Sequence, residues 1–266
     1  MEFSNIVTAY FSPTGTTRKI INAVTIGINT DKGETLDFTL PQGVPEQSPV
    51  FNNELVIFGA PGYGGRLPAT AVNRLKKLKG NNTPAVVVVV YGNREFEDAL
   101  LELRNLAVEQ GFTPIAGAAF IGEHSYTSPE TPVADGRPDP DDITKAEEFG
   151  KKINKKLASI GNLKNEKPID VPGNMPYKDS MPSSDDCAKT NTDLCTLCGT
   201  CVTVCPTGAI TPDDYYTTDP ELCIMCCACV KICPEDARYI DSPRIKKISK
   251  WLSENFATPK QPEIFI

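Results

Sequence analysis

The sequence predicts an α/β protein in two parts: a doubly wound parallel sheet of five strands, and a small α+β domain built around cysteines. Over residues 6–160, short apolar segments alternate with segments in which apolar residues recur at helical spacing. This alternation is typical of parallel strands that are covered by helices on both faces. Between residues 191 and 243, eight cysteines form two copies of one spacing.

The elements of the first part can be placed in order from these patterns. The expected strands cover residues 6–12, 34–40, 55–60, 85–91 and 113–121. The expected helices cover residues 16–28, 69–78 and 95–110, followed by a last helix capped by Asp141 or Asp142. Residues 41–53 are rich in proline and polar side chains and are expected to form a loop. Five strands and four helices fit the strand order 2-1-3-4-5, which places a ligand site where the order reverses.

The first loop at that site joins strand 1 to helix 1 and is rich in hydroxyls. Its candidate cofactor-binding residues are Ser12, Thr14, Gly15, Thr16 and Thr17. Their backbone N–H groups and hydroxyls can surround a phosphate at the helix N-terminus. The loop lacks the Walker pattern and its lysine, so it favours a single terminal monophosphate such as that of FMN. The alternative is a helix cap rich in Ser and Thr, without a ligand.

Two further loops reach the same edge of the sheet, and each combines glycine with a tyrosine. The candidates are Pro61, Gly62, Tyr63, Gly64 and Gly65 after strand 3, and Tyr91, Gly92 and Asn93 after strand 4. Glycine lets a backbone approach a flat ring closely, and a tyrosine can stack on it. The alternative for either loop is an ordinary turn with a partly buried ring.

A long loop, residues 122–140, follows the last strand and carries the only histidine, His124. Next to a bound ring, His124 could contact the ring or donate a proton. The alternative is an ordinary surface histidine. Arg137, in the same loop, is interpreted as a ligand contact or an anchor for the loop.

The cysteines follow a spacing that is specific to iron–sulfur clusters. Residues 195–206 read C-x2-C-x2-C-x3-C-P, and residues 223–234 repeat the pattern. In such runs the fourth cysteine serves the other cluster. We therefore assign two [4Fe–4S] clusters, one to Cys195, Cys198, Cys201 and Cys233, the other to Cys223, Cys226, Cys229 and Cys205. Structural zinc sites use pairs of cysteines instead, and disulfides are typical of exported proteins.

Two cysteines lie outside this assignment. Cys187 precedes both runs and is expected to be a small buried residue. Cys227 lies inside the second run, but the spacing selects its neighbour Cys226 as the ligand. We divide the chain into a first domain (1–160), a linker rich in proline and glycine (161–190), the cysteine domain (191–243), and an amphipathic helix with a tail (244–266), which is expected to dock on the protein's own body.

Composition and charge exclude several classes of partner. The net charge is −7. Residues 191–241 contain 8 acids and 2 bases, a net charge of −6, so nucleic acid is not expected as a partner. The acidic segment favours a redox partner protein with a basic surface; solubility alone is the alternative. No signal peptide and no membrane-spanning segment are expected, and the cysteines favour a reducing cytoplasm. A homodimer is left open.

The motifs carry two resemblances. Residues 6–160 resemble the flavodoxin family, whose T/S-x-T-G-x-T pattern is matched by residues 12–17. Residues 191–241 resemble bacterial-type two-cluster ferredoxins at all eight cysteines and both prolines. Together they resemble flavodoxin–ferredoxin fusion proteins of anaerobic microbes. The resemblance implies a flavodoxin-like sheet, bound FMN, and an aromatic residue on the flavin ring at Tyr63 or Tyr91.

These observations predict an oxidoreductase-type electron-transfer protein that passes electrons between two [4Fe–4S] clusters and FMN, and so couples one-electron and two-electron steps. The alternatives are an FMN-dependent reductase of a small molecule and a redox sensor or scaffold without bound flavin. Whether the protein is an enzyme is left open, and no catalytic residue is assigned. No G-x-G-x-x-G pattern follows a strand, so a bound nicotinamide cofactor is not expected.

Overall fold

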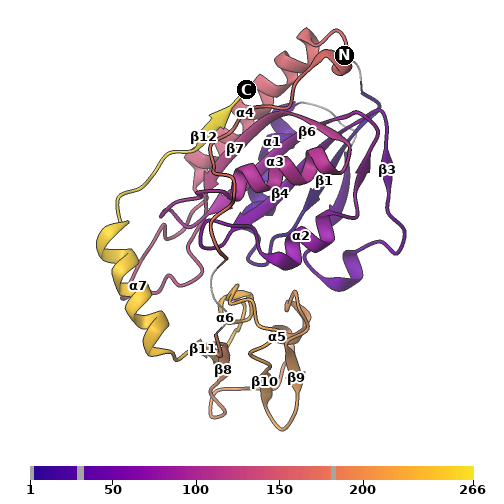
Figure 1. Ribbon diagram of the computed structural model, residues 1–266. Coiled ribbons are helices and arrows are strands. Elements are labelled where there is room, and N and C mark those ends of the chain that lie inside the picture. The colour runs from indigo at the N-terminus through magenta and orange to yellow at the C-terminus, as the bar shows by residue number, and fades with distance from the viewer. Residues whose placement is uncertain (1–2, 29–32, 181–183) are drawn as a thin grey trace.

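The computed structural model describes residues 3–28, 33–180 and 184–266. Its body is one sheet, with parallel strands β1 (Asn5–Tyr10), β2 (Gly33–Asp37), β4 (Glu54–Gly62), β6 (Thr83–Tyr91) and β7 (Phe112–Ile121). These strands follow the order β2-β1-β4-β6-β7, so the predicted order 2-1-3-4-5 is confirmed. A sixth strand, β12 (Glu263–Phe265), pairs antiparallel with β7 (Figure 1) and was not predicted.

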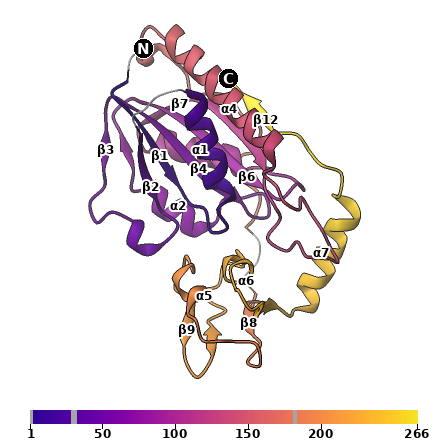
Figure 2. The ribbon, with the colours of Figure 1, turned by 180° about the vertical axis from the view of Figure 1, so that it is seen from behind.

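Helices cover both faces of the sheet because its strands are buried on both sides. Strand β6 is buried over its whole length, as its run of valines predicts. One face packs against α1 (Thr16–Ile28) and α4 (Pro140–Ser159), which lie in front of the sheet in Figure 2. The other face packs against α2 (Ala69–Leu75) and α3 (Ala99–Glu109). Two short strands, β3 (Val50–Phe51) and β5 (Lys79–Gly80), pair with each other beside the sheet.

Two helix starts differ from the prediction. Helix α3 begins at Ala99 and not at residue 95, because Glu97 has a φ of +44°, outside the helical region. Helix α4 is capped by Asp139, not by Asp141 or Asp142. The Asp139 side chain accepts from the backbone N–H of Asp142, whose own carboxylate accepts from the Asp139 N–H, forming a capping box.

The cysteine domain is a small α+β unit made of two similar halves. Strand β8 (Ala188–Thr190) pairs with β11 (Arg238–Ile240), and β9 (Ile210–Pro212) pairs with β10 (Tyr216–Thr218), both antiparallel. Each half has one short helix, α5 (Thr200–Thr203) or α6 (Ala228–Lys231). The left-handed residues before the helices also correspond: Gly199 has a φ of +77°, and Cys227, at the equivalent position, has a φ of +61°.

The segment predicted as a linker is docked on the first domain. The carboxylate of Asp98 accepts from the backbone N–H groups of Asn174 and Lys178. The Ile169 N–H donates to the Pro114 carbonyl, and Val171 is buried in the core. A short 3-10 helix, Pro41–Gly43, lies after β2, and another, Leu163–Asn165, follows α4.

Helix α7 (Pro243–Asn255) leaves the cysteine domain and runs back towards the first domain, where the tail ends in β12 (Figure 1). Its Ile245 and Leu252 are buried, so the helix docks on the body of the protein as predicted. Within the described residues, no helix has the length and apolar character needed to cross a membrane.

Candidate functional site

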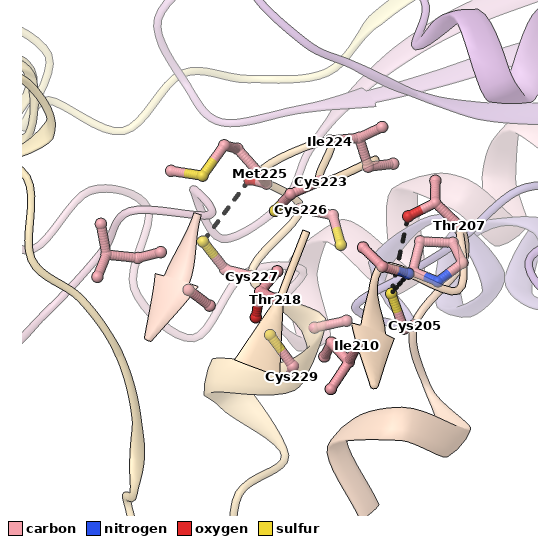
Figure 3. A pocket seen from close by; sticks show the side chains of 15 residues that line it. Cys205, Thr207, Ile210, Thr218, Cys223, Ile224, Met225, Cys226, Cys227 and Cys229 are labelled. Atoms are coloured by element: carbon pink, nitrogen blue, oxygen red, sulfur yellow. Dashed lines mark hydrogen bonds between the residues drawn. The ribbon is translucent and has the colours of Figure 1, made fainter. Parts of the chain in front are cut away.

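The eight motif cysteines line two separate cavities, four in each. One cavity is lined by a set that we call proximal: Cys205, Cys223, Cys226 and Cys229. The other cavity is lined by a set that we call distal: Cys195, Cys198, Cys201 and Cys233. Figure 3 shows the labelled cysteines of the proximal set gathered around their cavity. Each set takes three cysteines from one run and the fourth from the other, which is the division assigned from the spacing.

The arrangement of these thiols is the one that a cluster needs. Each set of four thiols lines a cavity, as a cubane with one thiolate per iron requires. The backbone N–H of Ala209 donates to the Cys205 Sγ at 3.3 Å, a contact that stabilises a thiolate.

A large cleft, with a volume of about 570 Å³, opens at the carboxyl ends of β1, β4, β6 and β7. Its lining includes these predicted residues: Ser12, Thr14, Thr16, Thr17, Pro61, Gly62, Tyr63, Gly64, Tyr91, Gly92 and His124. Three predicted residues, Gly15, Gly65 and Asn93, are described by the structure but do not line the cleft. The cleft therefore lies at the switch point of the sheet, where the strand order predicts a ligand.

Comparisons with known proteins address the two parts separately. The model of the 4Fe-4S binding domain family matches residues 188–211 and 216–239. The chain combines a flavodoxin-like fold with a 4Fe-4S binding domain. The first part of this statement rests on the strand order of the sheet, and the second on the family match.

Solved structures that resemble the chain include flavodoxins, which align at low identity with somewhat more than half of it. A flavodoxin of Megasphaera elsdenii aligns at 18% identity over 55% of this chain and 98% of its own, with a TM-score of 0.35. A flavodoxin of Streptococcus pneumonia aligns at 17% identity over 57% of this chain and 99% of its own, with a TM-score of 0.39. A Fusobacterium nucleatum flavodoxin bound to flavin mononucleotide aligns at 14% identity over 57% of this chain and 98% of its own, with a TM-score of 0.38. The comparison with curated proteins found no match.

The hydroxyl-rich loop of the flavodoxin-like domain contains a polar group that lacks a partner. Thr17 is 1% exposed, and its Oγ1 is buried without a hydrogen bond. Other groups of the loop are satisfied internally: the Ser12 Oγ accepts from the Arg18 N–H at 3.0 Å, and the Ser12 N–H donates to the Thr39 Oγ1 at 2.9 Å. Because an unpaired buried hydroxyl is costly, the loop fits an anionic group that accepts from Thr17.

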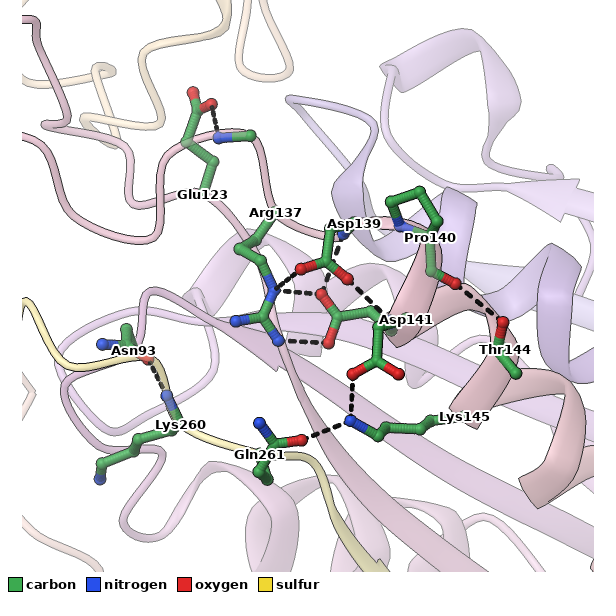
Figure 4. Close-up of polar contacts among 12 residues, drawn as sticks. Asn93, Glu123, Arg137, Asp139, Pro140, Asp141, Thr144, Lys145, Lys260 and Gln261 are labelled. Carbon is green, nitrogen blue, oxygen red and sulfur yellow. Dashed lines mark hydrogen bonds and ion pairs between the residues drawn. The ribbon is translucent and has the colours of Figure 1, made fainter.

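Two predicted residues have structural tasks instead. The Asn93 amide donates to the carbonyls of Phe256 and Thr258 at 2.7 and 2.9 Å, and its Oδ1 accepts from the Lys260 N–H. Asn93 therefore holds the tail that follows α7, and Figure 4 shows its contact with Lys260. Gly65 has a φ of +87°, and a Cβ there would lie 1.7 Å from the Glu97 carboxylate. Glycine is required at this position by close packing.

The aromatic residues of the cleft differ in their surroundings. Tyr91 is 3% exposed and packs edge-on against Phe96 in the core, with ring centroids 5.4 Å apart, so little of its ring is free to stack. Burial raises the pKa of Tyr63 well above its usual value, helped by nearby Cys226 and Cys227, and so keeps its phenol protonated. Sequence reasoning did not place Trp251, the only tryptophan, in the cleft; it lines the cleft from α7 and is 47% exposed.

The 4Fe-4S domain shares a wall with this cleft. Cys223, Ile224 and Met225 line both the proximal cavity and the cleft. Contacts between the domains include an ion pair of Lys231 with Glu123 and a hydrogen bond from the Arg74 guanidinium to the Pro206 carbonyl at 2.6 Å. No signal within the second cysteine run predicts this shared wall, because it depends on how the domains dock.

His124 is a neutral residue of the cleft wall. Its Nδ1 accepts from the Tyr126 N–H at 3.1 Å, which leaves Nε2 to carry the proton. Burial lowers the pKa of His124 to about 4, and the positive charges of Lys231 and Arg94 act in the same direction. Near neutral pH the residue is therefore a hydrogen-bond donor and not a cationic acid.

This lowered pKa predicts an acid-sensitive contribution to stability. Between pH 6.5 and about 4 an unfolded histidine binds a proton that the folded one does not, so stability falls as the pH falls. At pH 5 the loss is expected to be about 2 kcal/mol. Denaturant unfolding at pH 7 and pH 5 should show this loss in the wild type and not in His124→Gln. Equal acid sensitivity of the two proteins would contradict the assignment.

Proposed function

We propose that the chain is an electron-transfer protein that holds FMN in the cleft and one [4Fe–4S] cluster in each cysteine cavity, and so couples one-electron and two-electron redox steps. The observation that supports this most directly is the wall formed by Cys223, Ile224 and Met225, which separates the proximal cavity from the cleft by a single loop. An all-thiolate cluster exchanges one electron at a time, whereas a flavin accepts one or two.

The residues that line the cleft suggest where the phosphate and the ring of the FMN would bind. The Ser12–Thr17 loop would hold the phosphate, with the unpaired Thr17 hydroxyl as a donor. Gly62, Gly64 and Gly92 line the cleft where the ring would lie. A Cβ at Gly92 would lie 2.3 Å from His124, so glycine there lets His124 pack against the loop. Neutral His124 would offer the ring a hydrogen bond.

The distal set is the entry or exit point for a partner protein. Cys198 is exposed, and its neighbour Leu197 is 52% exposed, so the surface lies close to this cavity. The same domain exposes the carboxylates of Asp193, Asp213, Asp214, Glu235 and Asp236. We therefore propose a redox partner with a basic surface around an apolar contact. Electrons would pass between the partner, the distal set, the proximal set and the cleft, in that order.

The test is an anaerobic purification followed by iron analysis, flavin analysis and an optical spectrum. We expect about eight irons and about one FMN per chain. Absence of flavin from protein that holds its iron would contradict the proposal and favour a sensor or scaffold. Turnover of small acceptors by the holoprotein, with a chemical reductant, would then indicate a reductase and not a carrier.

A further inference from the structure

Arg238 is a buried cation that lies between the two cysteine cavities. It is 3% exposed, lines the distal cavity, and places its Nη2 3.9 Å from the Sγ of Cys229 in the proximal set. Its guanidinium also donates to Thr190 Oγ1 (2.5 Å), the Tyr216 carbonyl (2.8 Å), the Ala188 carbonyl (3.2 Å) and Thr218 Oγ1.

No described carboxylate balances this charge. None forms an ion pair with Arg238, although Asp and Glu outnumber Lys and Arg in the chain by 34 to 27. The Nε of Arg238 is buried and has no hydrogen-bond partner. A guanidinium stays charged when buried, and an uncompensated buried charge is strongly unfavourable. The counter-charge must therefore come from the groups in the two cavities.

The internal repeat shows that the fold does not require a cation here. The two runs align Cys205 with Cys233, so Ile210 occupies the position in the first half that Arg238 occupies in the second. Ile210 is 4% exposed and lines the proximal cavity, as Arg238 lines the distal one. An apolar side chain thus fills this position in one half, and the arginine adds charge to the other.

We propose that Arg238 is a redox-tuning residue, a fixed positive charge that raises the reduction potentials of the clusters in both cavities. The inference rests on the proposed function, since it requires anionic clusters there. Each cluster with its four thiolates is anionic, and reduction adds one more negative charge. A nearby cation stabilises the reduced form more than the oxidised form.

The test is a redox titration of the anaerobic holoprotein with dithionite, followed by electron paramagnetic resonance, on the wild type and on Arg238→Met, Arg238→Gln and Arg238→Lys. We expect the neutral variants to lower the equilibrium constant for one-electron reduction about tenfold, a shift of about −59 mV. Arg238→Lys, which keeps the charge, should stay close to the wild type. The matched control is Lys189→Gln, at an exposed cation on the neighbouring strand, and should shift nothing.

The outcomes separate this inference from the proposed function. A wild type without about eight irons would contradict the function itself. Full iron with unchanged potentials in Arg238→Met or Arg238→Gln would overturn the inference. Loss of iron in all three variants, Arg238→Lys included, would also overturn it, because it would show that the hydrogen bonds of the guanidinium are needed only to build the domain.

Discussion

Replacing Cys226 with alanine is expected to lower the iron content from about eight to about four atoms per chain, or fewer. The thiol of Cys226 is one of the four motif thiols that line the proximal cavity, and it has no substitute in the same position of the run. Because each set takes its fourth cysteine from the other half of the domain, loss of one cluster also removes a covalent link between the two halves. Metal binding supplies folding energy in such small domains, so thermal stability of the domain should fall as well.

The adjacent residue provides the matched control. Cys227 is also buried, at 4% exposure, and lines the same cavity, but its Sγ points to the Met225 carbonyl at 3.6 Å. Its φ of +61° is that of a glycine position, and the first half has Gly199 there. Cys227→Gly should therefore keep about eight irons. If Cys227→Gly lost iron and Cys226→Ala kept it, the two residues would have exchanged roles.

The sheet could be predicted from sequence because its signals are local. Each buried strand is a continuous apolar run, and the order follows from the alternation of strands and helices. Strand β12 could not be predicted in the same way. Residues 263–265 have the short sequence Glu-Ile-Phe, and they form a strand only because the edge of β7 offers unpaired backbone groups at that point.

For the site as well, residues that belong to local sequence patterns could be predicted, and residues that depend on long-range packing could not. The cysteine sets could be assigned because three ligands of each set lie within one short run. The phosphate loop could be placed because it joins adjacent elements of the chain. Trp251, Arg238 and the shared wall at Ile224 were not identified, since their positions depend on the docking of segments far apart in sequence. Asn93 was assigned to the cofactor because its loop lies at the carboxyl edge of the sheet. In the structure, however, its side-chain amide binds the tail, which is far away in sequence.

Replacing Asp142 with asparagine is expected to destabilise the flavodoxin-like domain by about 3–5 kcal/mol, because it removes the partner of a nearly buried cation. The side chains of Asp142 and Arg137 are 0% and 10% exposed, and they form a bidentate ion pair. Hydrogen bonding to Asp142 raises the pKa of Arg137. A guanidinium stays charged in a protein even without such a partner, so the substitution leaves a poorly compensated cation. The neutral amide would also weaken the capping box with Asp139 at the start of α4.

The same substitution at Asp141 is the control, since Asp141 lies in the same turn of α4 but its side chain is 66% exposed and forms an ion pair with Lys145. Asp141→Asn should cost less than about 1 kcal/mol. Denaturation of the full chain, followed by circular dichroism, measures the stability of both variants.

The Arg137 carbonyl accepts from the Glu123 N–H at 2.8 Å, so a displaced Arg137 should also weaken the binding of the proposed FMN beside His124. Equal stability of the two variants would mean that Asp139, 3.3 Å from Arg137, suffices as its counter-charge.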